Sequence, residues 1–303
     1  MGQGGIMKHL ITDIQRFSLS DGPGIRTTVF FKGCNLRCAW CHNPETLAFE
    51  QDLMHYQNKC IGCGKCLTVC PVGAHKVENG AHTVDRSKCT RCGACAQVCY
   101  AQALVMSGRE MSVEEIMEEL IQDKPYYEAS GGGVTLSGGE VLCHVDFALA
   151  LTKACKAAGI PVAVETNLSL PWEQVEDLLS QVDLVMADLK LWDTEEHKQA
   201  TGMGNAHVLE NLKKLQKPLI LRTPLIPGIT AKEENLRAIG NFAAGLPTLQ
   251  YYELLNFNPL GGSKYESLDT GNAFAQAKPY SPEEMAAFVA MVTPVTDRVK
   301  AGG

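Results

Sequence analysis

The stretch that decides the fold is residues 21–41, DGPGIRTTVFFKGCNLRCAWC, in which a glycine-rich loop, a short apolar run and three cysteines follow one another. Cys34, Cys38 and Cys41 have the spacing C-x3-C-x2-C. Three thiolates are one fewer than a [4Fe-4S] cluster usually takes from protein, so one iron would stay open to another ligand. Zinc is the alternative for three cysteines taken alone, because structural zinc sites also use closely spaced cysteines.

The surroundings of these cysteines narrow the choice. The stretch resembles the cluster loop of the radical S-adenosylmethionine (SAM) enzymes, and in particular that of the glycyl radical enzyme activating enzymes. The matching positions are Gly22, Gly24, Arg26, Phe30, Gly33, Cys34, Cys38, Cys41 and Pro44. The resemblance implies that the three cysteines hold a catalytic [4Fe-4S] cluster, whose open iron binds the amino and carboxylate groups of SAM.

The resemblance also gives a role to the loop before the cysteines. Its glycines and proline predict a turn over residues 21–26. In the family this loop lies near the glycine-bearing segment of a protein substrate. The candidates for contacting that segment are Asp21, Gly22, Pro23, Gly24 and Arg26.

Eight further cysteines form an internal repeat between residues 60 and 99. In the bacterial two-cluster ferredoxin run, which has this spacing, the fourth cysteine of each run binds the other cluster. The rule predicts one [4Fe-4S] cluster on Cys60, Cys63, Cys66 and Cys99 and another on Cys89, Cys92, Cys95 and Cys70. We therefore expect a ferredoxin-like insert over residues 52–105 that relays electrons, between two parts of the main domain at 1–51 and 106–303. Zinc is again the alternative, although zinc prefers separated C-x2-C pairs.

Composition limits the partners and the compartment. The chain has 303 residues, 45% of them hydrophobic, and a net charge of −7, which argues against nucleic acid and anionic membranes as partners. Thirteen cysteines without a recognisable secretion signal predict metal ligands in a reducing cytoplasm, and we expect a monomer. Cys143 and Cys155 stand apart from the motifs and are expected to fill the core. The eight histidines are expected mostly at the periphery.

A second glycine-rich segment is Ser137-Gly-Gly-Glu140. A loop of this kind could cradle a phosphate, but the Lys-Ser/Thr pair of a P-loop does not follow. About a hundred residues after the cysteines, it resembles the GGE motif of the same family. The resemblance implies that Gly138 and Gly139 offer backbone groups to the SAM ammonium. We place Glu140 and Trp40 among the SAM contacts as well.

Strands and helices alternate through the rest of the chain, which predicts parallel pairing. Strands are expected at 27–31, 134–136, 161–166, 183–190, 218–226 and 250–257, after a leading strand at 8–16. Helices are expected from Ser112, whose capping box includes Glu115, and at 145–158, 172–181, 194–201, 205–216, 231–244 and from 282, the last closing the sheet edge. Six alternating strands are too few for an eight-stranded barrel, and the resemblance implies an open (β/α)6 partial barrel.

Charged residues lie in or just after the predicted strands, where burial is costly unless the charges are paired or used. One explanation is a ladder of structural ion pairs. The resemblance implies instead that Lys190 and Arg222 hold the SAM carboxylate, Asp188 the ribose, and Glu165 the region of the amino group. Asn258 stands where relatives often have histidine and is also placed at SAM. The resemblance also implies a monovalent-cation site beside SAM, with Glu165, Thr166, Met186 and Asp188 as its candidates.

Together these features predict an activating enzyme. The resemblance implies that flavodoxin or ferredoxin donates an electron, SAM is cleaved to a 5′-deoxyadenosyl radical, and this radical removes hydrogen from a glycine Cα of a partner glycyl radical enzyme. Two alternatives stay open: a radical SAM enzyme that acts on a small molecule, and a non-catalytic iron-sulfur electron carrier. The sequence does not choose the partner enzyme.

Overall fold

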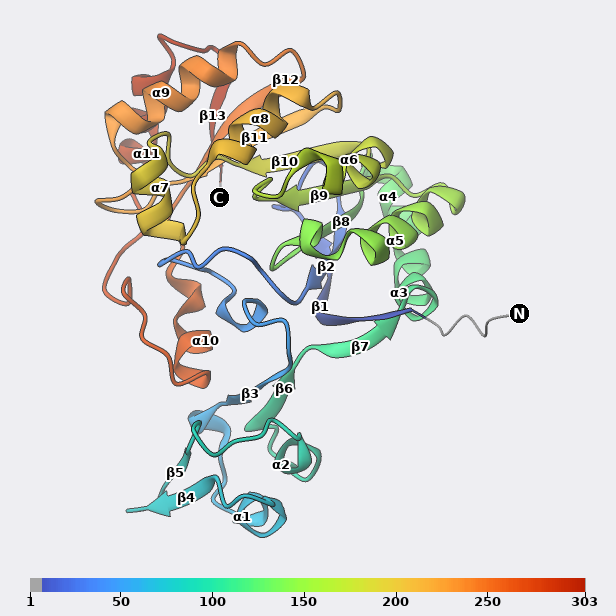
Figure 1. Ribbon diagram of the computed structural model, residues 1–303, viewed down its shortest axis with the longest axis vertical. Helices are drawn as coiled ribbons and strands as arrows, with labels where there is room; N and C mark the ends of the chain where they lie inside the picture. Colours follow the sequence, from blue (N-terminus) through green and yellow to red (C-terminus); the bar gives the residue numbers. More distant parts are fainter. Residues whose placement is uncertain (1–6, 303) are drawn as a thin grey trace.

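The computed structural model describes residues 7–302 (Figure 1); residues 1–6, where we expected no targeting signal, and residue 303 lie outside the description. Its centre is one nine-stranded sheet. The strands are β1 (Lys8–Ser18), β2 (Arg26–Phe31), β7 (Arg109–Ser112), β8 (Gly133–Gly138), β9 (Val162–Thr166), β10 (Leu184–Asp188), β11 (Leu219–Pro224), β12 (Leu249–Leu255) and β13 (Val299–Gly302). Their order is β13-β12-β11-β10-β9-β8-β2-β1-β7.

The pairing confirms the predicted parallel core. Neighbours from β2 through β8 to β13 are all parallel, whereas β1 pairs antiparallel with both β2 and β7. Strands β8 to β11 are buried on both faces along most of their length, as parallel strands between two covered faces usually are. Because the strands point the same way, their carboxyl ends meet at one edge of the sheet.

Helices follow most of the parallel strands and cover one face of the sheet (Figure 1). They are α3 (Val113–Leu120), α4 (Lys124–Ser130), α5 (Val145–Ala157), α6 (Trp172–Gln181), α7 (Thr194–Thr201), α8 (Ala206–Lys214), α9 (Glu233–Ala244) and α11 (Pro282–Val292). The main core lies between this layer and the sheet, and it includes the fully buried Cys155, as predicted. The capping box of Ser112 and Glu115 begins α3, also as predicted.

The opposite face of the sheet carries a smaller apolar cluster formed by Ala163, Leu184, Met186 and Ile220. The loop after β1 covers part of this face, because a Cβ on Gly22 would lie 3.4 Å from the sulfur of Met186. Polar side chains occupy the remainder of this face, near the carboxyl ends of the strands.

The prediction that the last helix closes the sheet edge was wrong. Strand β13 pairs in parallel with β12 and forms that edge, while α11 packs against α9 and β13. The β13 sequence, VKAG, has one β-branched residue and alternates too little to indicate a strand. It becomes a strand because the backbone of β12 offers it hydrogen bonds.

Residues 52–107 form a unit of their own beside the main sheet (Figure 1). Its elements are β3 (Asp52–His55), α1 (Lys65–Val69), β4 (His75–Glu78), β5 (Ala81–Val84), α2 (Ala94–Gln97) and β6 (Leu104–Ser107). β3 and β6 pair antiparallel at its base, and β4 and β5 pair with each other. Its apolar cluster has four buried members, Leu53, Val84, Cys95 and Leu104. Such a small core contributes little to the stability of the unit, which leaves the cysteines as its main source of stabilisation.

Two basic side chains, Lys32 and Arg86, form polar contacts at the boundary between this unit and the rest of the chain. The fully buried Lys32 follows β2, and its Nζ donates to the carbonyl of Glu45 at 2.5 Å and to Asp52 at 3.2 Å. On the other side, Arg86 binds Asp269 at 2.7 Å and the Ser267 carbonyl at 2.8 Å, at the end of the short helix α10 (Gly262–Ser267). Within residues 7–302, no helix is long and apolar enough to span a membrane.

Candidate active site

A cleft with about 870 Å³ of space lies at the carboxyl ends of the parallel strands. It brings together residues from four separate predicted motifs, which supports their assignment to one site. The predicted residues that line it are Cys34, Cys38, Trp40, Cys41, Gly138, Gly139, Glu140, Glu165, Asp188 and Lys190. Open α/β sheets generally bind ligands at this edge, outside the carboxyl ends of their strands.

Backbone hydrogen bonds fix the cysteine loop that follows β2. The Gly33 amide donates to the Thr46 carbonyl at 2.7 Å, and the Cys34 amide donates to the Leu47 carbonyl at 3.2 Å. At the other end of the loop, the buried hydroxyl of Tyr265 donates to the Cys41 carbonyl at 2.8 Å. The three cysteines are therefore held from both sides of the loop.

The chemistry of these thiols fits a polynuclear iron cluster better than one zinc ion. Burial raises the pKa of Cys34 and of Cys41 to about 12, so their thiolates need a nearby positive charge such as a metal centre provides. Zinc–sulfur bonds of about 2.3 Å would bring the sulfurs roughly 4 Å apart. Over residues 7–302, the one group of three ligand atoms within 4.8 Å of one another is Cys66, His75 and His82, so the three cleft cysteines are not gathered for a single ion.

The Ser137–Glu140 loop packs directly against the start of the cysteine loop. Gly138 has φ +109°, and a Cβ there would lie 2.4 Å from backbone atoms of Phe31. A Cβ on Gly139 would lie 2.3 Å from the Gly33 carbonyl oxygen. Glycine is needed at both positions because this close approach forms one wall of the cleft.

Glu140 is buried and its carboxylate is held by donors of the protein. It accepts hydrogen bonds from the Thr166 hydroxyl at 2.6 Å, the Asn167 amide at 2.7 Å and the Leu142 amide at 3.0 Å. Burial raises the pKa of this carboxyl group to about 7, although the same hydrogen bonds act to lower it. Glu140 thus ties the end of β8 to the end of β9. Its predicted contact with SAM stays a prediction.

Lys190 and Asp188 form an ion pair of 2.5 Å in the cleft. Burial by itself would lower the pKa of Lys190, but the Asp188 carboxylate and the thiol of Cys38 raise it above its usual value. The cleft therefore has a fixed positive charge next to the cysteines, which suits a ligand carboxylate.

Arg222 lies deeper in the sheet and does not line the cleft. Its guanidinium binds Glu165 at 2.6 Å, Glu253 at 2.8 Å and the Ser20 carbonyl at 3.3 Å. Arg222 thus forms the structural ion pairs of the alternative, and its predicted contact with the SAM carboxylate stays a prediction. Glu165 still reaches the cleft, where it also accepts a hydrogen bond from Ser137 at 2.5 Å.

The loop of residues 19–25 is a series of bends, as predicted, but Arg26 is not part of it. Arg26 begins β2 and is buried, and its guanidinium donates to Thr135 and to the Val134 carbonyl, both at 2.6 Å. The expectation that it belongs to the loop was wrong, because the strand pairing with β8 starts at Arg26 itself. Asp21 accepts hydrogen bonds from Ser18 and Thr28, at 2.7 and 2.6 Å.

Asn258 lies beside the cleft and not in its lining. It is exposed, and its side chain caps a short 3-10 helix by accepting from the Leu260 amide at 3.0 Å. It shares a small neighbouring pocket with Trp40 and Cys41. The main cleft also has lining residues that we did not single out, among them Asn167, whose position directly after Glu165-Thr166 at a strand end was the available signal.

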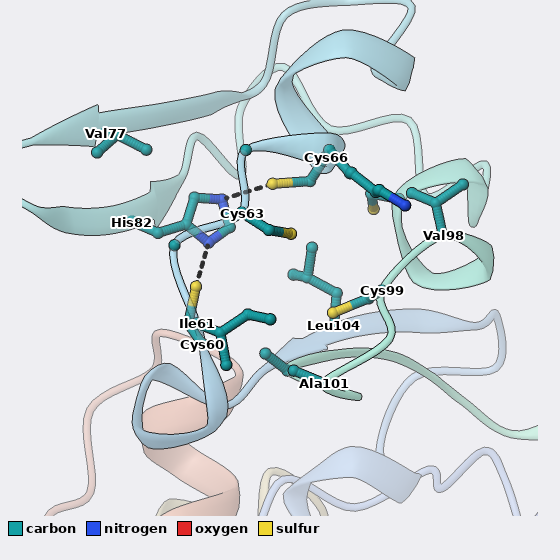
Figure 2. A pocket seen from close by; sticks show the side chains of 15 residues that line it. Cys60, Ile61, Cys63, Cys66, Val77, His82, Val98, Cys99, Ala101 and Leu104 are labelled. Atoms are coloured by element: carbon teal, nitrogen blue, oxygen red, sulfur yellow. Dashed lines mark hydrogen bonds between the residues drawn. The ribbon is translucent and has the colours of Figure 1, made fainter.

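The cysteines of residues 60–99 line two further cavities. Cys60, Cys63, Cys66 and Cys99 line the first (Figure 2), and Cys70, Cys89, Cys92 and Cys95 line the second. Cys95 touches the first cavity as well. The expectation of peripheral histidines was wrong here: His55, His75 and His82 are buried in this unit, because three segments that are separate in sequence converge on it.

Comparison with known proteins agrees with this geometry. The family model of the radical SAM superfamily matches residues 28–238. The chain is 41% identical to the benzylsuccinate synthase activating enzyme of Thauera aromatica, over 88% of this chain and 83% of that protein. It is 38% identical to the indoleacetate decarboxylase activating enzyme of Tractidigestivibacter scatoligenes, over 93% of each.

A solved structure shows the same fold at low identity. The peptide-bound SuiB of Streptococcus suis superposes with a TM-score of 0.52 and 12% identity, over 89% of this chain and 46% of that one. Family model and relatives together cover the cysteine loop, the glycine-rich loop and the strand ends described above. The chain belongs to the radical SAM superfamily and, within it, to the glycyl radical enzyme activating enzymes.

Proposed function

We propose that this chain cleaves SAM in the cleft and uses it to place a radical on a glycine of a partner glycyl radical enzyme. One observation carries the proposal: a single cleft gathers the three cysteines, both glycines of Ser137–Glu140 and the Asp188–Lys190 pair. These are the groups that a [4Fe-4S] cluster with one open iron and a zwitterionic ligand beside it require.

Each side chain has a distinct task in this proposal. Cys34, Cys38 and Cys41 hold the cluster, which when bound supplies the electron that converts SAM to methionine and a 5′-deoxyadenosyl radical. Lys190 binds the SAM carboxylate and Asp188 the ribose hydroxyls. The backbone of Gly138 and Gly139 receives the ammonium group. The protein thereby orients SAM and excludes water, and no acid–base residue is needed.

We propose further that the sheet is an open (β/α)6 partial barrel that admits the protein substrate from its open side. Supporting this, β7 and β13 are the two ends of the sheet order and each has one neighbour there. The loop of Asp21, Gly22, Pro23 and Gly24 lies over the inner face and would meet the substrate glycine loop.

Residues 52–105 are proposed to be a ferredoxin-like insert with two more [4Fe-4S] clusters, between parts of the SAM domain at 1–51 and 106–303. The two cavities support this proposal. Each is lined by the four cysteines that are assigned to one cluster when the fourth cysteine of each run binds the other cluster. The insert would pass electrons from flavodoxin or ferredoxin toward the cleft.

The experiment is anaerobic reconstitution, reduction and addition of SAM, with and without a glycyl radical enzyme. 5′-Deoxyadenosine together with a glycine-centred doublet in the electron paramagnetic resonance (EPR) spectrum is expected, and Cys34→Ala should abolish both. Deoxyadenosine without a doublet for any tested partner would favour a small-molecule substrate. No deoxyadenosine from fully iron-loaded protein would favour a plain electron carrier.

A further inference from the structure

A buried histidine lies against the first cysteine cavity of the insert (Figure 2). His82 comes from β5, and 5% of its surface is exposed. Its Nε2 is 3.5 Å from the sulfur of Cys66, and its Nδ1 is 4.0 Å from the sulfur of Cys60. The imidazole therefore faces two of the four proposed ligands of one cluster.

Two more buried imidazoles hold this ring in place. His75 Nδ1 lies 3.0 Å from His82 Nε2, and His55 Nε2 lies 3.0 Å from His82 Nδ1. Both distances are those of nitrogen–nitrogen hydrogen bonds. His55, His75 and His82 thus form a chain of three imidazoles, which we call the histidine relay, with His82 at its centre.

The relay restricts which nitrogen of His82 carries the proton. All three imidazoles are buried, and burial disfavours the charged form of an imidazole. A neutral imidazole has one N–H donor and one acceptor nitrogen. If His55 Nε2–H donates to His82 Nδ1, the N–H of His82 is at Nε2, where it faces both the Cys66 sulfur at 3.5 Å and His75 Nδ1 at 3.0 Å.

We propose that His82 donates its Nε2–H to the Cys66 thiolate, with the tautomer set by His55, and thereby raises the reduction potential of the Cys60/Cys63/Cys66/Cys99 cluster. The inference rests on the proposed function, since it assumes that this cluster is present. An N–H directed at a ligand sulfur stabilises the extra negative charge of the reduced cluster. His82 is a positioning and tuning residue in this role; the competing arrangement, one metal ion bound by Cys66, His75 and His82, whose ligand atoms lie within 4.8 Å of one another, is separated from it by the test below.

The second half of the repeat lacks this contact. Among the described residues, no imidazole nitrogen forms a hydrogen bond with Cys70, Cys89, Cys92 or Cys95; Cys70 accepts instead from the Ala74 amide at 3.3 Å. The two cysteine runs, 60–70 and 89–99, have the same sequence spacing, so His82 is a specific difference between the surroundings of the two ligand sets. A change at His82 should therefore shift the potential of one insert cluster and leave that of the other unchanged.

The test uses the full chain, reconstituted anaerobically, with Cys34→Ala in the background to remove the cleft cluster. Iron and sulfide content and an EPR-monitored potential titration are measured for the background protein, His82→Leu and His82→Gln. Glutamine keeps an N–H donor, whereas leucine does not. Val77→Ala is the matched control, because Val77 lines the same cavity without a hydrogen-bonding group.

One of the two insert clusters is expected to shift to a lower potential in His82→Leu, by at least a tenfold change in the reduced-to-oxidised ratio, about 59 mV for one electron. His82→Gln should shift less, and Val77→Ala not at all. Equal potentials in all variants at full iron content would overturn the inference. If His82→Leu loses iron, the result for His82→Gln decides between the two roles of His82. Iron loss in His82→Gln as well would indicate that His82 is a metal ligand, and this would also overturn the inference. Background protein that binds no iron would instead contradict the proposed function.

Discussion

Arg222 and Glu165 form an ion pair across the sheet, with Nη1 of the buried arginine 2.6 Å from Oε1 of the half-buried glutamate. The same guanidinium binds Glu253 on the neighbouring strand at 2.8 Å. Burial raises the pKa of Glu165, and the charge of Arg222 opposes that rise. The arginine therefore offsets part of the cost of burying the Glu165 carboxylate and holds it at the edge of the cleft.

Replacing Arg222 with methionine should destabilise the folded protein strongly. Removing one partner from a buried ion pair typically costs about 3–5 kcal/mol, because the other charge stays buried and unpaired. The midpoint of thermal unfolding of the iron-loaded protein measures this loss. Arg237→Met is the control, since Arg237 pairs with Glu233 on an exposed helix face, where a pair is worth about 0–1 kcal/mol. If Arg222→Met leaves the unfolding midpoint unchanged and weakens SAM binding, Arg222 instead contacts the SAM carboxylate directly.

Lys190→Met is expected to weaken SAM binding at least ~10-fold, because a charge-assisted hydrogen bond to a carboxylate contributes about 1.5–3 kcal/mol. The variant also leaves Asp188 without its 2.5 Å partner, so the effect should be larger than for Asp188→Asn. Equilibrium dialysis against SAM, with iron content matched, gives the affinities. Lys232→Met provides the comparison, since this lysine pairs with Glu196 on the surface. Equal affinity in Lys190→Met and the wild type would remove Lys190 from the SAM site.

Glu140 should make stability depend on pH in the direction opposite to an ordinary salt-bridged carboxylate. Its pKa is about 7 in the folded protein against 4.5 for an unperturbed glutamate, so the folded state binds its proton more strongly. The free energy of unfolding then falls as pH rises from about 4.5 to about 7 and is level beyond that range. Compared with Glu140→Gln, the wild type should lose thermal stability between pH 5.5 and pH 8. A difference in melting temperature that is the same at both pH values would show that Glu140 is not protonated in the fold.

The sequence predicted the parts of this structure that depend on local pattern. Buried apolar runs predicted six of the seven parallel strands to within two residues at each end, and the spacing of cysteines and glycines predicted much of the lining of the cleft. Long-range pairing was harder to foresee. Strand β13 takes its conformation from β12, Arg222 is engaged by carboxylates from two other strands, and the histidine relay forms because residues 55, 75 and 82 meet only after the insert folds.

Tyr265 illustrates the same difficulty and gives the last prediction. It is 224 residues from Cys41 in sequence, yet its hydroxyl donates to the Cys41 carbonyl at 2.8 Å. The adjacent Lys264 binds Asn43 and Glu45 at 2.6 and 2.7 Å, so α10 holds the far end of the cysteine loop. The ring of Tyr265 is buried, and burial raises the pKa of its hydroxyl to about 12, which keeps it a donor at any working pH.

Tyr265→Phe removes that hydroxyl and leaves the ring packing intact. The expected cost is about 1 kcal/mol, concentrated in the loop that carries the cleft cysteines. Iron should therefore leave this site several-fold faster when a chelator is added anaerobically, while the insert sites keep their rate. Tyr126→Phe, at an exposed position on α4, should not change either rate. If iron leaves the insert and the cleft faster to the same extent, Tyr265 stabilises the whole fold and not the loop, because a local hydrogen bond cannot act equally on both.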